Sequence, residues 1–281
     1  MDKREELQAI GENLNVPTLP AVVLEVNRMV ADPTVGSKEI GAKIASDQGL
    51  ATKVLQLANS SAYGLAEEVL SAEHAASVIG GEGLKNIALQ ASIMSKFEKY
   101  SNLPDFDLED LWDHSMLTAQ LSRCLGQRSR PVRTMTPEDF YTCGLLHDVG
   151  KLVLLDNLGD EYLEVMRHAR QVGQVLHVGE QQSLGYTHVD VGVLVSSRWD
   201  FPEGIQQAIA YHHGPKEMVF GNPAVAIVAI ADQLAYRVTS TSFDHVAQRL
   251  GKLAHALLGV SREGFQEVLA EALRHAEEAK V

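Results

Sequence analysis

The chain has 281 residues, of which 45% are hydrophobic, enough to bury a sizeable core in one or two domains. Its 37 acidic residues exceed its 24 lysines and arginines, which gives a formal net charge of -13. This charge opposes the attraction to phosphate backbones on which nucleic-acid binding depends, and no apolar run approaches the roughly 20 residues of a membrane span. We therefore expect neither nucleic acid nor a membrane as a partner.

The first residues and the cysteines bear on the cellular compartment. Residues 1–6, Met-Asp-Lys-Arg-Glu-Glu, run directly into acidic side chains without an apolar signal core. Cys124 and Cys143 are too few for a disulfide framework, and we interpret both as small core residues rather than nucleophiles. These features indicate a cytoplasmic protein.

Nearly every periodic segment of the sequence predicts a helix. In the N-terminal third, Leu50, Val54 and Leu57 share one helix face, and Ser37 and Ser71 stand where N-caps are expected. Alternating strand patterns bounded by turn residues are scarce. We therefore predict an all-α protein.

A polar stretch at residues 98–104, which ends in proline, is the best candidate for a linker. We accordingly predict a two-lobed helical bundle. Its N-terminal lobe covers residues 1–97, a second lobe that carries the functional site covers residues 98–240, and helices in residues 241–281 pack on the second lobe.

One basic stretch runs from Arg123 to Arg133 and contains four arginines. We interpret it as a solvated loop, centred on residues 126–135, rather than a nucleic-acid patch, because the chain as a whole is acidic. The negative net charge of the chain is still compatible with a small phosphorylated ligand, because a bound metal would make the charge positive at the binding site.

The second half of the chain contains several helix starts. Thr136-Pro-Glu-Asp139 combines a threonine cap, a proline and an acid, and it predicts a helix that holds His147-Asp148. Thr187-His-Val-Asp190 repeats the cap and the acid, which places His188 in the first turn of a helix. Further helices are predicted from Pro202 to His212-His213, from Pro223 through Asp232, and over residues 243–258 and 261–279.

The most informative feature of the sequence is the adjacent pair His147-Asp148. Its imidazole and carboxylate provide one nitrogen and one oxygen ligand, a combination that suits a divalent metal. Lys151 follows one helical turn later, where its charge could stabilise a metal-bound phosphate. The dipeptide alone is weakly specific, and its weight comes from other candidate ligands on separate predicted helices: Asp110, His114, His188, His212, His213 and Asp232.

Each candidate ligand also has a structural interpretation. His114 follows Asp110 by four residues on one helix face and shares a stripe with leucines, as a core histidine would. Asp232 lies on an otherwise apolar helix, where an ionised carboxylate is costly unless it is paired or bound to metal. His177 is one of several histidines in polar or scattered contexts, and we interpret it as a surface residue. The six inward-facing candidates together favour a metal site and metal-assisted hydrolysis of a phosphoester.

These residues resemble the HD superfamily of metal-dependent phosphohydrolases, whose His…His-Asp…Asp ligand set matches His114, His147, Asp148 and Asp232 here. From about Val16 to Tyr236 the chain is most similar to the HDOD subgroup, bacterial proteins associated with signal transduction. The resemblance implies an HD-like helical fold. It is carried by Leu19-Pro-Ala-Val, Ile44 to Gly64, Ala75-Ala-Ser-Val-Ile-Gly, Trp112-Asp-His-Ser, Gly144-Leu-Leu-His-Asp-Val-Gly-Lys, His188-Val-Asp-Val-Gly, Trp199-Asp-Phe-Pro and His212-His213.

The related HD-GYP phosphodiesterases, which cleave cyclic dinucleotides, use additional ligands. Their motifs match Asp110 (where the relatives have glutamate), His188, His212 and His213, and their lysine matches Lys151. After His213, however, this chain has Gly-Pro-Lys-Glu where those enzymes carry an Asp-Gly-x-Gly-Tyr-Pro loop. The resemblance therefore does not extend to cyclic-dinucleotide recognition.

The resemblance implies one or two divalent metal ions, with manganese, iron, magnesium and nickel as candidates, and catalytic roles for Asp148 and Lys151. We favour a regulatory module of bacterial signalling that retains the metal site and interacts with signalling proteins or a small phosphorylated ligand. Two alternatives stay open. One is an active metal-dependent phosphohydrolase that acts on a nucleotide or another phosphoester, and the other is a metal-free helical interaction scaffold.

Overall fold

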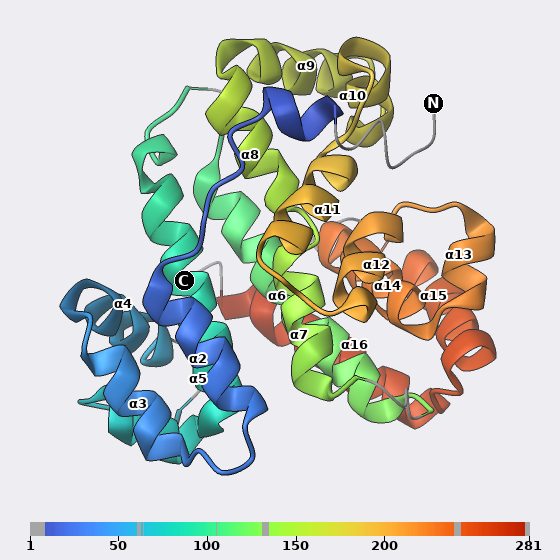
Figure 1. The fold of residues 1–281 in the computed structure, drawn as a ribbon. Coiled ribbons are helices and arrows are strands. Elements are labelled where there is room, and N and C mark those ends of the chain that lie inside the picture. The colour runs from blue at the N-terminus through green and yellow to red at the C-terminus, as the bar shows by residue number, and fades with distance from the viewer. Residues whose placement is uncertain are drawn as a thin grey trace. The chain divides into compact units, whose positions relative to one another are not determined.

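The computed structural model describes residues 9–60, 63, 65–104, 106–130, 135–238 and 243–278. These residues form α-helices joined by short loops, with a short 3-10 helix at Glu98–Tyr100 and no strand (Figure 1). The prediction of an all-α fold is confirmed. No helix in the described ranges has both the length and the apolar character that a membrane crossing requires.

The chain divides into two compact units, and the smaller one covers residues 18–99. It contains α2 (Ala21–Ala31), α3 (Ser37–Ala45), α4 (Gln48–Ala58) and α5 (Ala72–Phe97). The first three helices each pack against α5. Leu50 and Val54 of α4 are buried, as their helical spacing predicts. Gly80 interrupts α5 with a φ of 83°, a conformation that glycine adopts without the steric cost of a side chain.

Two helix starts in this unit were predicted from serines. Ser71 caps α5, because its hydroxyl oxygen accepts a hydrogen bond from the His74 backbone N–H at 3.1 Å. Ser37 is instead the first residue of α3, whose cap is Gly36, so that prediction was wrong by one position. The Glu39 carboxylate, which accepts from the Gly36 N–H at 2.8 Å, supplies the capping bond.

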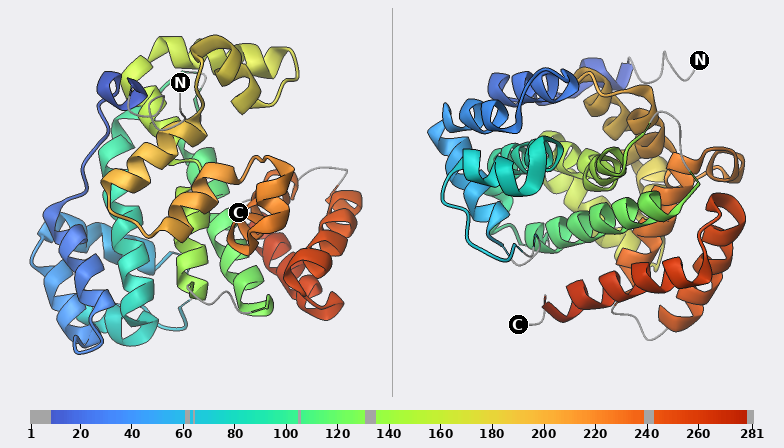
Figure 2. Two further views of the ribbon diagram at one scale, coloured as in Figure 1. Left: turned by 45° about the vertical axis from the view of Figure 1, so that its right-hand side comes forward. Right: turned by 90° about the horizontal axis from the view of Figure 1, so that it is seen from below.

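The larger unit comprises the chain up to Pro17 and from Tyr100 onward. Its helices are α6 (Leu108–Arg128), α7 (Pro137–Leu146), α8 (Val149–Leu158), α9 (Asp160–Gln171), α10 (Leu176–Leu184), α11 (His188–Arg198), α12 (Glu203–Tyr211), α13 (Lys216–Gly221), α14 (Pro223–Arg237), α15 (Phe243–Leu258) and α16 (Arg262–Glu278). α6 packs against α7, α14 and α16, and α8 packs against α11. Figure 2 shows the green α6 and the red α16 side by side, although they are far apart in sequence.

Polar contacts within the larger unit hold residues 15–17 in place. The Trp199 indole N–H donates to the Pro17 carbonyl oxygen at 2.8 Å, and the Asn15 backbone N–H donates to the Asn157 side chain at 2.7 Å. Trp199 itself is buried. These bonds fix residues 15–17 against α8 and the end of α11.

The basic stretch is not a loop throughout, because α6 continues to Arg128. Arg128 pairs with Glu267 of α16, and Arg123 lies 3.6 Å from Glu138 of α7. The prediction of a solvated loop was therefore wrong at its start, where the arginines join α6 to neighbouring helices. Arg133 lies outside the described residues.

Candidate metal centre

The predicted ligands His147 and Asp148 lie between two helices rather than inside one. α7 ends at Leu146 and α8 begins at Val149, so His147 is the C-cap of α7 and Asp148 the N-cap of α8. Asp148 leaves the helical conformation, with φ at -102° and ψ at 7°. The predicted start of α7 is confirmed, since Thr136 and Asp139 form a capping box. The prediction that the helix continues through His147-Asp148 was wrong.

Two glycines permit the helix approaches that bring the ligands together. A Cβ atom at Gly144 would lie 2.6 Å from the Ala119 Cα, so α7 crosses α6 closely near His147. A Cβ atom at Gly150 would lie 1.9 Å from the carbonyl oxygen of His188. α8 therefore meets the first turn of α11 in backbone contact, and this contact places Asp148 beside His188.

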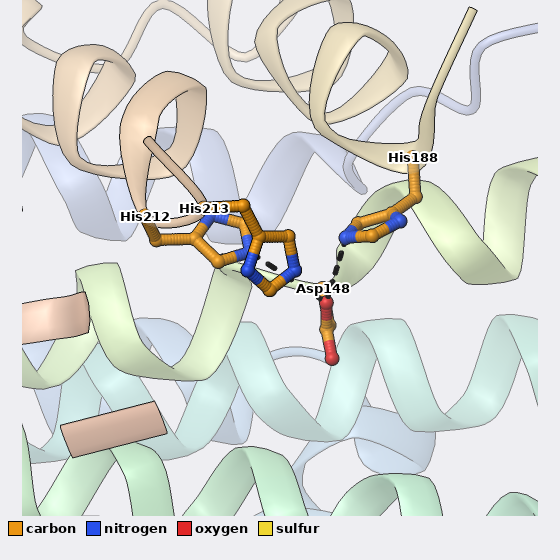
Figure 3. A group of neighbouring side chains, drawn as sticks. All are labelled: Asp148, His188, His212 and His213. Atoms are coloured by element: carbon orange, nitrogen blue, oxygen red, sulfur yellow. Dashed lines mark ion pairs between the residues drawn. The ribbon is translucent and has the colours of Figure 1, made fainter. Parts of the chain in front are cut away.

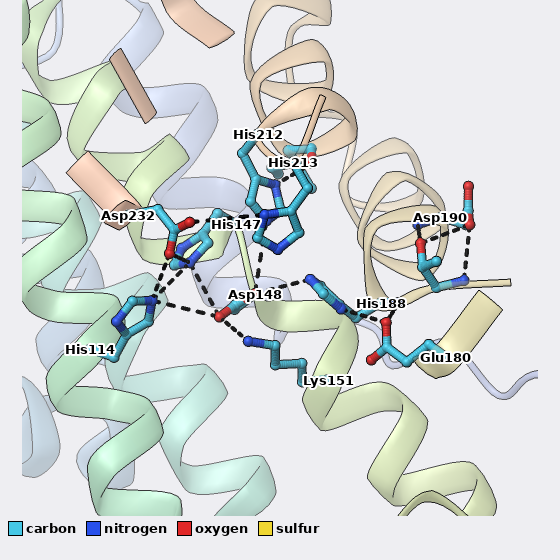
Figure 4. A network of polar contacts seen from close by, with 12 residues as sticks. His114, His147, Asp148, Lys151, Glu180, His188, Asp190, His212, His213 and Asp232 are labelled. Atoms are coloured by element: carbon cyan, nitrogen blue, oxygen red, sulfur yellow. Dashed lines mark hydrogen bonds and ion pairs between the residues drawn. The ribbon is translucent and has the colours of Figure 1, made fainter. Parts of the chain in front are cut away.

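A first group of side chains comes from α6, the end of α7 and α14 (Figure 4). His114 Nε2 lies 3.2 Å from His147 Nε2 and 3.1 Å from Asp232 Oδ1. His147 Nε2 lies 3.6 Å from the same Asp232 oxygen. The possible ligand atoms of the three residues lie within 4.8 Å of one another.

A second group contains Asp148, His188, His212 and His213 (Figure 3). His188 reaches it from the first turn of α11, which begins at the predicted capping box of Thr187 and Asp190. His188 Nε2 lies 3.3 Å from Asp148 Oδ1, and His212 Nε2 lies 3.9 Å from the same oxygen. His212 is the C-cap of α12, and the His213 side chain keeps 24% of its exposure.

Asp148 belongs to both groups by geometry. Its Oδ2 atom lies 3.2 Å from His147 Nε2 and 3.8 Å from His114 Nε2, while its Oδ1 atom faces His188 and His212. One buried carboxylate therefore presents an oxygen to each group. Such a shared carboxylate suits a centre with two adjacent metal positions.

Three histidines are held with Nε2 toward the centre. His147 Nδ1 lies 2.7 Å from the Gly144 carbonyl oxygen, and His212 Nδ1 lies 2.8 Å from that of Ile209. His188 Nδ1 lies 2.6 Å from Glu180 Oε2. Because these oxygens accept hydrogen bonds, each Nδ1 carries the proton when the ring is neutral and Nε2 keeps its lone pair.

Unsatisfied buried atoms also indicate that these residues could hold a metal. Asp148 Oδ1, His188 Nε2 and His212 Nε2 are buried and have no hydrogen-bond partner among the described residues. A buried polar atom without a partner costs roughly 1–3 kcal/mol, so three of them in one place need an explanation. A divalent metal would satisfy all three.

The pKa values of the ligand histidines are shifted in different directions. Burial disfavours the charged ring of His147, yet Asp148 and Asp232 outweigh it and raise the pKa of His147 to about 10. In contrast, burial and the nearby His188 lower the pKa of His213 to about 3. Burial and His213 also lower the pKa of His212. Burial also disfavours the charged ring of His188, but Glu180 outweighs it and raises the pKa of His188. The surroundings of His212 and His213 favour the neutral ring, the form of histidine that binds metals.

The two remaining predicted site residues are placed differently. Lys151 Nζ lies 2.5 Å from Asp148 Oδ2, and its side chain keeps 17% exposure, so it borders the centre and remains within reach of solvent. Asp110 is exposed in the first turn of α6 and belongs to neither ligand group. The structure thus gathers every predicted metal ligand except Asp110.

Sequence reasoning missed three residues near the centre. His177 of α10 was predicted at the surface, but it is half-buried and its ring stacks on His213, with centroids 4.4 Å apart. Glu180, one turn later on α10, binds His188, and Tyr162 of α9 binds Glu180. The spacing of His177 and Glu180 puts both on one helix face, which is the signal that the sequence offered.

Several solved structures share the fold of this chain. An HDOD domain protein of unknown function from Geobacter sulfurreducens is 25% identical, with a TM-score of 0.78 over 98% of this chain and 95% of that one. A Shewanella amazonensis protein whose name proposes a phosphohydrolase is 22% identical, with a TM-score of 0.75 over 98% of this chain and 97% of that one. A Marinobacter aquaeolei protein whose name proposes a role in signal transduction is 22% identical, with a TM-score of 0.76 over 98% of this chain and 63% of that one. The last two show the fold alone.

The curated sequence relatives are longer proteins, and this chain matches only part of each. An uncharacterized protein of Treponema pallidum is 25% identical over 222 residues, which are 78% of this chain and 42% of that protein. The chain thus spans less than half the length of the curated relatives it matches. The HDOD domain matches residues 16–215, a span that includes most of the ligands described above. The chain belongs to the HDOD domain family.

Proposed function

We propose that the chain is a cytoplasmic regulatory module of bacterial signalling that binds one or two divalent metal ions and a small phosphorylated ligand. We expect the module to hydrolyse phosphoesters only slowly. The observation that carries it is the set of buried atoms that lack a hydrogen-bond partner among the described residues, Asp148 Oδ1, His188 Nε2 and His212 Nε2. Their convergence within one ligand group supports a bound metal over a metal-free scaffold.

The residues around the centre would bind and orient a phosphate. When bound, a divalent metal would supply an activated water and a positive charge for the phosphate oxygens. Lys151, which is charged and reaches solvent beside Asp148, would donate to a phosphate oxygen and stabilise charge that develops on it. The partly exposed His213 marks the side from which a ligand would enter.

Slow turnover is proposed because the ligands alone do not position a substrate. Residues 214–217, Gly-Pro-Lys-Glu, follow the ligand His213 where the phosphodiesterases that this site resembles carry a substrate loop. A misplacement of about 1 Å can cost on the order of a hundredfold in rate. The signalling role is supported by family membership and by the name of the Marinobacter protein.

An active phosphohydrolase is the second candidate. It is favoured by the completeness of the two ligand groups and by the name of the Shewanella protein. The two candidates share the metal and differ in the rate and selectivity of turnover.

A phosphoester panel with added Mn²⁺ tests the proposal. We expect weak hydrolysis of p-nitrophenyl phosphate and bis-p-nitrophenyl phosphate, and no efficient cleavage of a cyclic dinucleotide. Asp148→Ala should abolish the activity, whereas Asp160→Ala, which removes an exposed carboxylate from α9, should retain it. Fast, selective turnover of one nucleotide would establish the second candidate. Inactivity with every divalent metal would rule out hydrolysis.

A further inference from the structure

Behind the metal ligand His188 lies a buried carboxylate with three donors. Glu180 Oε2 accepts from the His188 backbone N–H at 2.9 Å and lies 2.6 Å from His188 Nδ1. Its other oxygen accepts from the Tyr162 hydroxyl at 2.6 Å. Glu180 and Tyr162 are both fully buried, at 0% exposure. Figure 4 shows Glu180 directly behind His188, on the side away from Asp148.

The support of His188 differs from that of the other oriented ligands. His147 and His212 rest their Nδ1 atoms on the backbone carbonyl oxygens of Gly144 and Ile209. A carboxylate carries a full negative charge, so it makes the imidazole a stronger electron donor at Nε2 than a carbonyl does. The carboxylate therefore does more than orient His188: it also strengthens the binding of a cation at His188 Nε2.

Burial of Glu180 also needs a reason. An ionised carboxylate in the interior is costly unless it is paired and hydrogen-bonded. The three donors offset part of this cost, and a metal on the far side of His188 would offset more. Tyr162, which comes from α9, fixes the second oxygen and so fixes the carboxylate's rotation.

We propose that Glu180, held by Tyr162, is a positioning residue that sets the metal affinity of the Asp148, His188, His212 and His213 group by acting through His188. The inference rests on the proposed function, because it requires a metal in that group. It adds α9 and α10 to the elements that determine metal binding.

Metal titration of three variants of the 281-residue chain tests the inference. Co²⁺ would be added to metal-free protein, with binding followed by visible absorption and by competition with a chelating dye. Glu180→Gln keeps the size of the side chain and removes its charge, so we expect affinity at one metal position to fall roughly tenfold to a hundredfold. The position formed by His114, His147 and Asp232 should change little. Glu161→Gln, an exposed glutamate beside Tyr162, is the matched control and should bind like wild type.

Tyr162→Phe keeps the carboxylate and most of the packing, and it covers the case in which Glu180→Gln does not fold. We expect it to weaken the same position by a smaller factor. Wild-type affinity in Tyr162→Phe and in a folded Glu180→Gln would overturn the inference, as would an equal loss at both positions. A wild-type protein that binds no Co²⁺ would instead reject the proposed metal centre itself.

Discussion

Replacing Asp148 with alanine is expected to weaken metal binding sharply at both ligand groups. The two oxygens of this side chain face different groups, Oδ2 toward His147 and Oδ1 toward His188, at 3.2 and 3.3 Å. Loss of a supporting residue behind a ligand typically costs 10–100-fold in affinity, so loss of the shared ligand should cost at least about that much. Calorimetric titration with Mn²⁺ would measure it, with Asp160→Ala as the control.

The same substitution should also destabilise the metal-free protein. Asp148 is the carboxylate beside both Lys151 and His147, and its removal leaves those buried or nearly buried cations with less compensation. Breaking a buried ion pair from one side costs about 3–5 kcal/mol. Denaturant unfolding in a chelator would show this loss separately from the loss of metal. Metal binding by Asp148→Ala with wild-type affinity would contradict the assignment.

Gly150→Ala is expected to separate α8 from α11 and to loosen the second ligand group. The new Cβ atom would lie 1.9 Å from the His188 carbonyl oxygen and 2.9 Å from the Gly192 nitrogen. Both are backbone atoms, so no side-chain rotation relieves the contact. Overpacking of this kind costs typically about 1–3 kcal/mol, and the helix shift would move His188 away from Asp148. We therefore expect a lower free energy of unfolding together with weaker metal binding.

Gly221→Ala is the control for this substitution. Gly221 ends α13, and a Cβ atom there would meet nothing within 4 Å. Its stability and metal affinity should stay close to wild type. If Gly150→Ala matched wild type in both respects, the close approach of α8 and α11 would be wrong.

Helix starts set by local chemistry were predicted well from the sequence. The capping boxes at Thr136 and Thr187, and Pro223 at the start of α14, depend only on residues within one turn. The break at His147-Asp148 was not predicted, because apolar residues continue on both sides of it at helical spacing. Only the packing of α7 on α6 and of α8 on α11 shows where one helix ends.

The sequence predicted which residues form the site, but it did not predict how they are arranged in space. Motif spacing identified the histidines and aspartates, but which ligands share a group depends on helix packing across distant parts of the chain. Asp110 was assigned to the site by its match to a motif of the related phosphodiesterases, yet its side chain is exposed in the first turn of α6. Glu180 was missed because its role appears only when α10 lies beside the start of α11.

Metal content of the purified wild-type protein tests the central claim most directly. The protein would be loaded in turn with Mn²⁺, Fe²⁺, Mg²⁺ and Ni²⁺, freed of excess metal, and measured by elemental analysis, with thermal unfolding recorded before and after chelation. We predict that at least one of these metals is retained at one or more ions per chain and that chelation lowers the unfolding temperature, because a ligand that binds only the folded state stabilises it. Negligible retention of all four metals, with an unfolding temperature that chelation leaves unchanged, would contradict the metal centre.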